Sequence, residues 1–409
     1  MKIVEGGSFV AAPSCGLYLA QFGADVIRFD TIGGGPDFRR WPQSPDGVSL
    51  YWEGLNKGKK SIAVDLSSAQ GRELVSDLIA APGADRGIFL TNYPAQGFLS
   101  YERLRERRAD LILVRVMGHA DGTPAVDYTI NSAVGLPFMT GPESLGDVPV
   151  NHSLPAWDLL TGAYAGMALL TAERHRRETG EGQEVRVPLS DVAIASLGNL
   201  GQIAEVSIGG ADRKRYGNDL FGAFGRDFET RDRRRIMVIA ITAGQWKSLV
   251  GVLGIAAQVA ALERRTGRSF AEDEGERFKC RAEPNAIVGE AVAQCDYQSL
   301  TKKFADGGVC WGPYNTLGEA LRTDLKFSPA NPMLSAVEHA SGHTYLTPGS
   351  AGSFSSGERM PSVRAPRLGE HTDEILAEGW GLSSGQFGIL HERGIGAGGA
   401  QGCLLVAVF

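Results

Sequence analysis

The residue with the clearest chemical potential in this 409-residue chain is Asp158, within the stretch LPAWDLLTGAYAGMALL. Residues 159–172 contain no Asp, Glu, Lys or Arg. An aspartate at this point could cap a helix, because its carboxylate accepts hydrogen bonds from free backbone amides and is favoured by the helix dipole. It could equally attack an acyl group, because an aspartate with the ordinary pKa of about 3.9 is ionised at neutral pH without a partner base. The pattern alone leaves both interpretations open.

Basic residues near the start of the chain form a second group with possible chemistry. They are Arg39, Arg40, Lys57, Lys59 and Lys60. In a protein whose net charge is −6, such a cluster could bind phosphate groups. It could also be a solvated loop, because Gly58 separates the lysines from any rigid helix.

Other candidate ligand residues directly follow short apolar runs that are typical of strands. Asn92 and Tyr93 follow one run, and an amide beside an aromatic ring suits a purine, although an Asx turn explains them equally well. Phe9 and Val10 follow the first run and would line a crevice at the carboxyl end of a sheet. His119 follows another run, where it could be a catalytic base or a loop histidine bonded to backbone.

Several other chemistries are not indicated by the spacing. Gly6 and Gly7 are adjacent, and Pro13 stands where a dinucleotide fingerprint would place its third glycine, so nicotinamide binding is not expected. The pattern contains no Gly-x-Ser-x-Gly elbow and no pair of histidines spaced for a metal. The five cysteines lack close pairing, which argues against a zinc site and against a disulfide framework. We therefore expect neither a metal nor a redox cofactor.

The hydrophobic pattern predicts an α/β scaffold that could position these residues. Strand-like runs stand at 2–7, 24–30, 61–66, 87–92 and 110–118, and helical patterns at 13–23, 70–81 and 101–107 separate most of them. Strands that alternate with helices in this way pair in parallel through right-handed crossovers. A further helix is expected over residues 190–206, directly after the segment GEGQEVRVPL at 180–189.

A change in composition near Ser207 predicts a second, smaller α+β domain. The following residues are rich in glycine and aromatics, and a hairpin with a charged turn at Arg231 to Arg235 comes next. The predicted boundaries are 1–206 for the N-terminal part of a large domain, 207–225 for a linker, 226–325 for the small domain, 326–395 for a return linker and the C-terminal part of the large domain, and 396–409 for a tail.

Composition and charge limit the partners. With 43% hydrophobic and 22% charged residues the chain is typical of a globular protein, and its acidic balance argues against general affinity for nucleic acid. The first twenty residues lack the pattern of a signal peptide, and no apolar run is suited to cross a membrane. We expect a cytoplasmic protein with neither a membrane partner nor a nucleic-acid partner.

Four ordered blocks of the sequence resemble the class III coenzyme A transferases, a superfamily that includes formyl-CoA transferase, carnitine CoA-transferase and α-methylacyl-CoA racemase. The blocks are GGSFVAAPSCGLYLAQFGADVIRFD, LNKGKKSIAVDLSSAQGREL, PAWDLLTGAYAGMALLTAERHRRETGEGQEVRVPLSD and RAPRLGEHTDEIL. The resemblance runs from Val4 to about His391 and implies an acyl-CoA substrate, with Asp158 as the nucleophile and no cofactor beyond the CoA of the substrate. It also implies an interlocked, ring-like homodimer, in which each chain has a Rossmann-like large domain built from both chain ends and an inserted smaller domain.

Some positions depart from the family pattern, so the CoA contacts are expected to be partly rebuilt. Val10 replaces a glutamine, Thr31 replaces a basic residue, and an arginine of the family falls in a gap near Gly97. The set that we expect to contact substrate or CoA is Phe9, Val10, Ala11, Arg39, Lys57, Val64, Asn92, Tyr93 and His119.

Two segments, GTPAVDYTINSAVGLPFMTGPE and NHSLPAWDLLTGAYAGMALL, are most similar to family members that move CoA between the C1 and C4 carboxyls of mesaconyl-CoA. That similarity implies an intramolecular transferase, which is also classed as an isomerase, acting through an aspartyl mixed anhydride and an aspartyl-CoA thioester. Backbone amides at 221–226 are the expected stabilisers of the oxyanion. The alternatives are intermolecular CoA transfer and α-methylacyl-CoA racemisation, but the racemase branch has a histidine where this chain has Val126. A CoA- or nucleotide-binding protein without catalysis, in which Asp158 only caps a helix, is a distant alternative.

Overall fold

The computed structural model describes residues 1–380 and 392–398, and the chain divides into two compact units. The first unit comprises Met1–Val134, His152–Ile208 and Leu325–Phe409, and the second comprises Gly135–Asn151 and Gly209–Asp324. Each unit therefore combines segments that are far apart in the sequence. The short segment Gly135–Asn151 separates Asp127 from Asp158 along the chain but belongs to the second unit, whereas both aspartates belong to the first.

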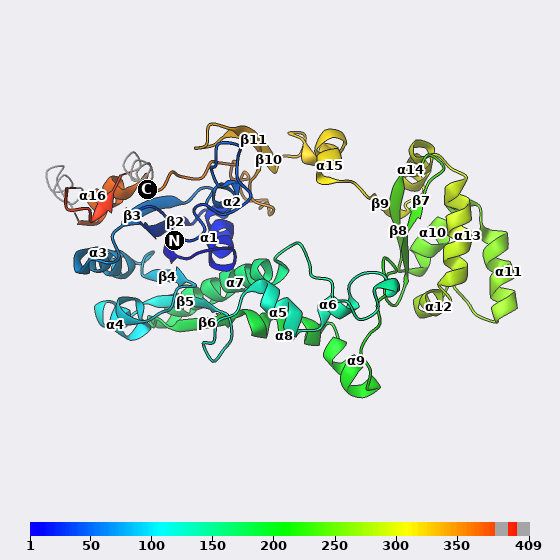
Figure 1. Ribbon diagram of the computed structural model, residues 1–409, viewed down its shortest axis with the longest axis horizontal. Coiled ribbons are helices and arrows are strands. Elements are labelled where there is room, and N and C mark those ends of the chain that lie inside the picture. Colours follow the sequence, from blue (N-terminus) through cyan, green and yellow to red (C-terminus); the bar gives the residue numbers. More distant parts are fainter. Residues whose placement is uncertain (381–391, 399–409) are drawn as a thin grey trace. The chain divides into compact units, whose positions relative to one another are not determined.

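The first unit is built on a sheet whose strand order is β12-β3-β2-β1-β4-β5-β6 (Figure 1). Its strands are β1 (Lys2–Gly6), β2 (Asp25–Thr31), β3 (Lys60–Val64), β4 (Ile88–Thr91), β5 (Ile112–Met117), β6 (Glu184–Pro188) and β12 (Gly396–Ala397). All neighbouring pairs are parallel except β12, which runs antiparallel to β3. The predicted α/β class, with a parallel sheet fed from both ends of the chain, is confirmed.

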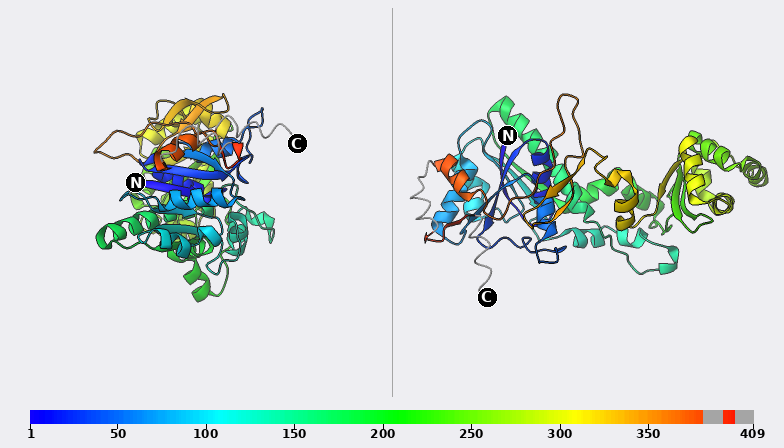
Figure 2. Two further views of the ribbon diagram at one scale, coloured as in Figure 1. Left: turned by 90° about the vertical axis from the view of Figure 1, so that its left-hand side faces the viewer. Right: turned by 90° about the horizontal axis from the view of Figure 1, so that it is seen from above.

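Helices cover both faces of this sheet (Figures 1 and 2). The helices of the first unit are α1 (Ala11–Gln21), α2 (Leu50–Leu55), α3 (Ala69–Ala80), α4 (Tyr101–Arg107), α5 (Asp127–Ala133), α7 (Ala156–Thr179), α8 (Leu189–Asn199), α9 (Gln202–Gly209) and α16 (Thr372–Trp380), with short 3₁₀ turns at Gly97–Leu99 and Leu325–Phe327. Because helices lie on both sides, the parallel strands are buried on both faces. Ile3, Phe29, Ile62, Phe89 and Leu113 accordingly have no more than 2% of their surface exposed.

Small residues in α7 allow it to pack closely against α1. A Cβ atom added at Gly162 would lie 2.1 Å from Ser14 Oγ and 2.7 Å from the Ala11 carbonyl oxygen, which is closer than atoms can approach. A side chain of any size at this position would therefore push the two helices apart. The uncharged, glycine-containing stretch after Asp158 is thus explained by helix packing, and it fixes the start of α7 against the first helix of the sheet.

The C-terminal segment returns to the same sheet. It forms the hairpin of β10 (Leu334–Glu338) and β11 (Thr344–Pro348) and then α16. Thr372 Oγ1 accepts a hydrogen bond from the Ala63 amide at 3.1 Å and donates one to the Ala397 carbonyl at 3.0 Å. These bonds tie the end of the described chain to β3.

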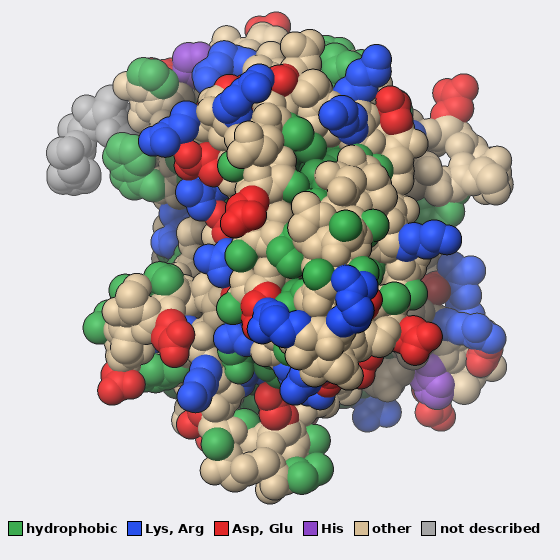
Figure 3. Space-filling view, turned by 90° about the vertical axis from the view of Figure 1, so that its right-hand side faces the viewer, with side chains coloured by type: hydrophobic (Ala, Val, Ile, Leu, Met, Phe, Trp, Pro, Cys, Tyr) green, Lys and Arg blue, Asp and Glu red, His purple; other side chains and the backbone are tan. Residues whose placement is uncertain are grey.

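The second unit contains the antiparallel sheet β7-β8-β9, formed by Phe224–Glu229, Arg235–Ala240 and Cys310–Pro313. The predicted hairpin with its charged turn is the pair β7–β8. Its helices are α6 (Leu136–Met139), α10 (Ala243–Leu253), α11 (Ala256–Thr266), α12 (Glu274–Lys279), α13 (Ala282–Ala293), α14 (Tyr297–Asp306) and α15 (Leu317–Thr323), with a 3₁₀ turn at Glu143–Leu145. On the face of the molecule drawn in Figure 3, positive and negative side chains are interspersed.

Four cysteines fall within the described residues, and all four are free: Cys15, Cys280, Cys295 and Cys310. Cys403 lies outside the described residues, as does most of the predicted tail. In the part of the chain that the structure describes, no single helix is long and apolar enough to cross a membrane, although α8 and α9, which meet at a 66° bend, pass that test together. No cluster of three or more His, Cys, Asp or Glu side chains among the same residues could hold a metal ion.

Candidate active site

Asp158 lies in the first turn of α7 but does not cap that helix. The N-cap residue is Pro155, and it makes no side-chain capping bond. The carboxylate of Asp127, the first residue of α5, performs this function instead: its Oδ2 accepts hydrogen bonds from the Trp157 amide at 2.7 Å and the Asp158 amide at 3.1 Å. The interpretation of Asp158 as the cap is therefore wrong. A different carboxylate satisfies the amides at the helix start, which leaves that of Asp158 available for chemistry.

Asp127 is held in this position by contacts on both of its oxygens. It is 1% exposed, and its Oδ1 lies 2.5 Å from Nε2 of His152, four residues before α7. The His152 ring meets Tyr128 edge-on, with ring centroids 5.6 Å apart. Trp157 Nε1 donates to Asn131 Oδ1 at 3.2 Å, which joins α5 and α7 a second time. These contacts make the start of α7 a rigid part of the first unit.

The surroundings of Asp158 raise the pKa of its carboxyl group to about 7. Burial is the largest cause, the negative charge of Asp127 adds to it, and the positive charge of Arg40 opposes it. The expectation of an ordinary aspartate pKa is therefore wrong, because tertiary burial disfavours the charged form. A carboxylate of higher pKa is more basic and less solvated, and strongly perturbed pKa values are typical of functional sites.

Arg40 connects Asp158 to the turn between β1 and α1. Its guanidinium lies over the ring of Phe9 at 5.3 Å and over the ring of Tyr51 at 5.4 Å, distances at which a cation is attracted to an aromatic face. Burial raises the pKa of Tyr51 to about 12, so its hydroxyl keeps its proton at neutral pH and can donate a hydrogen bond. The site thus offers a carboxylate, a guanidinium, a phenol and an aromatic wall.

Phe9 occupies a strained backbone position in this turn. Its φ is 66°, in the left-handed region that residues other than glycine rarely adopt, and its side chain is 40% exposed. Its amide donates to Asp37 Oδ2 at 3.2 Å. Such strain costs on the order of 1–3 kcal/mol and persists only where the surroundings enforce it. The enforced turn presents the ring of Phe9 at the carboxyl edge of the sheet.

Asn92 and Tyr93 hold the same turn from β4. Asn92 accepts from the Ser8 amide at 2.9 Å and donates to the Ser8 carbonyl at 2.8 Å, so its amide group is paired with backbone. The Tyr93 hydroxyl accepts from Ser8 Oγ at 3.3 Å and donates to the Gly7 carbonyl at 3.5 Å. The structure therefore places both residues beside Phe9, where they position the turn through Gly7 and Ser8.

A buried ionic network lies beneath the turn. Arg28 donates to both oxygens of Asp30, at 2.8 and 2.9 Å, and to Asp37 at 2.9 Å. Lys59 donates to Glu5 at 2.8 Å, and neither side chain is exposed. Lys59 is thus neither a phosphate ligand nor a solvated loop residue, because its ammonium group is paired with the buried carboxylate of Glu5. Since Arg28 holds Asp37 and Asp37 holds the amide of Phe9, the network supports the strained turn.

The remaining sequence-predicted residues lie in different places. Val64 is fully buried in the core, and Val10 and Ala11 are buried at the start of α1. His119 lies in a turn in which its amide donates to the Thr123 carbonyl at 3.2 Å. Arg39 is exposed and lines a separate cavity of about 240 Å³ beside Trp52.

Within the first unit, Lys57 and Lys60 lie at the other edge of the sheet from these residues. Lys60 pairs with Glu374 at 2.8 Å, and Lys57 lies just before β3, at the amino edge of the sheet. The residues 221–226 belong to the second unit. The structure therefore brings Phe9, Asn92 and Tyr93 together at the carboxyl edge, and Arg40 links Phe9 electrostatically to Asp158.

Sequence reasoning assigned no role to His152 or to Asp127. The two residues are 25 positions apart, and Asp127 is 31 positions from Asp158, so no local pattern connects them. Asp127 lies in the first turn of α5, where an aspartate is common because the helix dipole favours it, so its residue type alone does not indicate the contact with α7.

Comparisons with known proteins agree over most of the chain. The profile of CoA-transferase family III matches residues 1–372. The chain is 51% identical over 399 residues to 2-methylfumaryl-CoA isomerase of Chloroflexus aurantiacus, with 97% of each chain covered. It is 27% identical over 395 residues to succinyl-CoA:mesaconate CoA-transferase of Haloarcula marismortui, with 92% of this chain and 95% of that one covered. Among solved structures, a CAIB/BAIF family protein from Brucella suis matches with a TM-score of 0.74 and 27% identity, covering 92% of this chain and 98% of that one. The chain belongs to CoA-transferase family III.

Proposed function

We propose that this protein moves CoA between the C1 and C4 carboxyl groups of mesaconyl-CoA, with Asp158 as the nucleophile. The observation that carries the proposal is that Asp158 is freed from capping by Asp127 and has a raised pKa. The 51% identity to a protein named 2-methylfumaryl-CoA isomerase supports the substrate, because mesaconate is 2-methylfumarate.

The proposed reaction proceeds through two acyl-enzyme species. The Asp158 carboxylate attacks the C1 carbonyl, the C–S bond breaks, and CoA leaves as a thiolate while a mixed anhydride forms. The thiolate then attacks the Asp158 carbonyl of the anhydride, which gives aspartyl-CoA and releases the C1 carboxylate. The C4 carboxylate attacks aspartyl-CoA to form the second anhydride, and the thiolate returns to C4 and frees Asp158. No net proton is taken up or lost, so the cycle needs no separate general base.

Residues beside Asp158 suit the charges of this reaction. The positive charge of Arg40 acts on Asp158. We therefore propose that Arg40 binds whichever of the two substrate carboxylates is not reacting. The Tyr51 hydroxyl, protonated at neutral pH, is suited to donate to the developing oxyanion. Phe9 supplies an apolar wall next to both. Holding both carboxyls of one acyl unit in this site gives the high effective concentration of an intramolecular step.

We place the CoA moiety along the carboxyl edge of the sheet. This edge carries the exposed ring of Phe9 and the turn that Asn92 and Tyr93 hold. Ligands of open α/β sheets bind in the crevice outside the carboxyl ends of the strands. Asn92 and Tyr93 then contribute to CoA binding by positioning the turn. We also propose a cytoplasmic location, which the free thiols of the described cysteines support.

A homodimer is proposed from the apolar surface of the first unit. Large apolar side chains on α7, α8 and α9 are exposed by 40% or more: Leu160, Tyr164, Met167, Leu170, Ile194, Ile203, Val206 and Ile208. Apolar side chains gathered on neighbouring elements often mark an interface between proteins, and a second copy of the chain is the proposed cover. Light scattering should give twice the chain mass of 43.6 kDa, and Met167→Glu with Leu170→Glu should give the monomer mass. A wild-type monomer contradicts this proposal.

The test of the function is an assay with mesaconyl-C1-CoA, followed by chromatography of the thioesters. The wild-type protein should form the C4 thioester, and Asp158→Asn should lower turnover by at least a thousandfold. Asp191→Asn is the matched control, because Asp191 is an exposed aspartate in the first turn of α8. It should retain wild-type turnover. An active Asp158→Asn protein, free of deamidation, contradicts the nucleophile assignment, and wild-type inactivity toward mesaconyl-C1-CoA contradicts the substrate assignment.

A further inference from the structure

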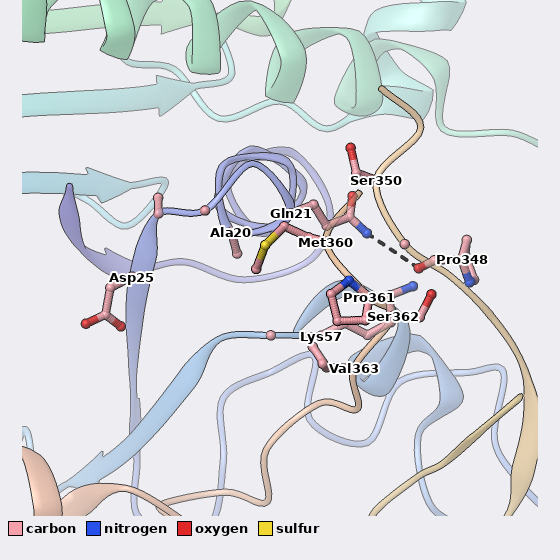
Figure 4. A pocket seen from close by; sticks show the side chains of 14 residues that line it. Ala20, Gln21, Asp25, Lys57, Pro348, Ser350, Met360, Pro361, Ser362 and Val363 are labelled. Carbon is pink, nitrogen blue, oxygen red and sulfur yellow. Dashed lines mark hydrogen bonds between the residues drawn. The ribbon is translucent and has the colours of Figure 1, made fainter. Parts of the chain in front are cut away.

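A cavity of about 220 Å³ lies at the amino edge of the sheet, at the opposite ends of the strands from Phe9 and Asn92 (Figure 4). Its walls come from the end of α1, the start of β2, the residues just before β3 and the returning segment 348–363. Because β2 begins at Asp25 and β3 at Lys60, this cavity is separated from the carboxyl edge by the length of the strands.

Lys57 lines this cavity without a partner. It is 8% exposed, and among the described residues its Nζ atom has no hydrogen bond and no ion pair. Burial lowers its pKa to about 8, so a large fraction of the amine is charged at neutral pH. A buried ammonium without a counter-ion is unfavourable, whereas the other buried lysine of the same loop, Lys59, is paired with Glu5. Of these two buried lysines, Lys59 therefore has an anionic partner, whereas Lys57 has none among the described residues.

The charged groups around Lys57 do not neutralise it. Asp25 lines the same cavity but forms its ion pair with Lys2, at 3.8 Å. Glu53, one helical turn before Lys57, accepts hydrogen bonds from the Ser341 amide at 2.9 Å and the Tyr345 hydroxyl at 3.1 Å. The other ionisable neighbours are cationic or neutral: His339, whose pKa is lowered chiefly by burial, and Arg364, which pairs with Glu370.

Each of the other side-chain donors of the cavity already makes one hydrogen bond to a backbone carbonyl. Ser350 Oγ donates to the Gly352 carbonyl at 2.9 Å, and Ser362 Oγ donates to the Met333 carbonyl at 3.4 Å. Gln21 Nε2 donates to the Pro348 carbonyl at 3.5 Å, as the dashed line in Figure 4 shows. The Lys57 ammonium is thus the cationic donor that the lining offers to a ligand.

Apolar atoms form much of the rest of the wall, from Ala20, Met360, Pro361 and Val363. The cavity volume of about 220 Å³ is large enough for a small organic molecule. A ligand of this size with one negative charge and an apolar body matches one ammonium and apolar walls. A dianion such as phosphate would leave its second charge uncompensated in the cavity.

We propose that this cavity binds a short-chain monocarboxylate, whose carboxylate pairs with Lys57 and whose hydrocarbon part contacts Ala20, Met360 and Val363. Occupancy joins the end of α1 to the returning segment 348–363, both of which line the cavity. The site is distinct from that of Asp158, and its existence does not depend on the proposed reaction.

Trace acetylation with acetic anhydride tests this proposal at the residue itself. Label is measured by tandem mass spectrometry on the chymotryptic peptide that contains Lys57 and Lys60, so the partly exposed Lys60, which does not line the cavity, is an internal control. At ten times its dissociation constant, butyrate should lower labelling of Lys57 about tenfold and leave Lys60 unchanged. Butyramide, the neutral isostere, should protect neither. Unchanged Lys57 labelling with 50 mM butyrate, equal protection by butyramide, or no labelling of Lys57 in the free protein contradicts the proposal.

A variant gives a second, independent measurement. Butyrate should raise the melting temperature of wild-type protein and of Lys60→Met. It should also raise the melting temperature of Arg40→Gln, and adding Lys57→Met to that variant should abolish this rise. The Arg40 background removes any contribution from carboxylate binding beside Asp158. Butyrate stabilisation that is equal with and without Lys57 contradicts the proposed site, and stabilisation by inorganic phosphate in place of butyrate contradicts the proposed ligand class.

Discussion

Replacing Asp158 with asparagine should make the protein more stable at alkaline pH while it abolishes turnover. The folded protein raises the pKa of this carboxyl group from 3.8 to about 7, so ionisation of Asp158 is less favourable in the folded state than in the unfolded chain. A shift of about three units corresponds to an upper limit of about 4 kcal/mol. Because Asp158 is partly exposed and water screens its charge, we expect about 1–3 kcal/mol.

The sign of the effect follows from which state holds the proton. Between pH 4 and pH 7 the unfolded chain has released the Asp158 proton while the folded protein still binds it, so the wild type loses stability as the pH rises. Above pH 7 both states are ionised, and the loss is complete. Asparagine has no proton to lose, so it avoids the cost of burying a negative charge, a cost that the wild type incurs only as the pH rises and Asp158 ionises. The stability advantage of Asp158→Asn should therefore be near zero at pH 4 and reach its full value by pH 8.

Urea unfolding of wild type, Asp158→Asn and Asp191→Asn, followed by circular dichroism from pH 4 to pH 9, measures this difference. Asp191 is exposed in the first turn of α8, so its replacement should cost about 0.3–1 kcal/mol through the helix dipole. Parallel stability curves for wild type and Asp158→Asn, constant to within about 0.5 kcal/mol across this range, would refute the raised pKa and the burial argument behind it.

Two further predictions follow from the same geometry. Asp127→Asn should shift the acidic limb of the kcat–pH profile to lower pH, because the charge of Asp127 raises the pKa of Asp158. Arg40→Gln should shift this limb to higher pH, because the charge of Arg40 lowers that pKa. Shifts in the same direction for both variants would contradict the electrostatic assignment. Gly162→Ala should destabilise the protein by about 2 kcal/mol or more, measured by urea unfolding, because its Cβ would lie 2.1 Å from a side-chain oxygen of α1. Gly166→Ala is the matched control in the same helix, where the nearest atom is 3.9 Å away, and it should stabilise by about 0.5–1 kcal/mol; equal effects of the two alanines would contradict the close packing.

The sequence predicts the scaffold well because strand and helix periodicity is local. The β-branched and apolar runs around β2, β3 and β5 are buried on both faces, and this is the pattern that parallel strands require. The structure gives the physical reason for the uncharged, glycine-containing stretch after Asp158, because Gly162 lies too close to α1 to carry a side chain.

The electrostatics of the site are not local and could not be predicted in this way. Asp127 takes over the capping of α7 from 31 residues away, and this contact decides what the carboxylate of Asp158 can do. Lys59 is paired with Glu5, 54 residues away, so a cluster of lysines in the sequence divides into residues with different surroundings in the fold. The strain at Phe9 is imposed by Asp37 and by the residues after β4, which no propensity of phenylalanine reveals.

We propose that CoA moves within one acyl unit that remains bound beside Asp158. The most direct measurement incubates the enzyme with unlabelled mesaconyl-C1-CoA and isotopically labelled free mesaconate, then follows label in the C4 thioester by mass spectrometry. The account predicts a C4 thioester with almost no label, formed at a rate that does not depend on the added acid. A heavily labelled C4 thioester, formed faster as free mesaconate is added, would contradict it and would mean that the chain transfers CoA between separate molecules.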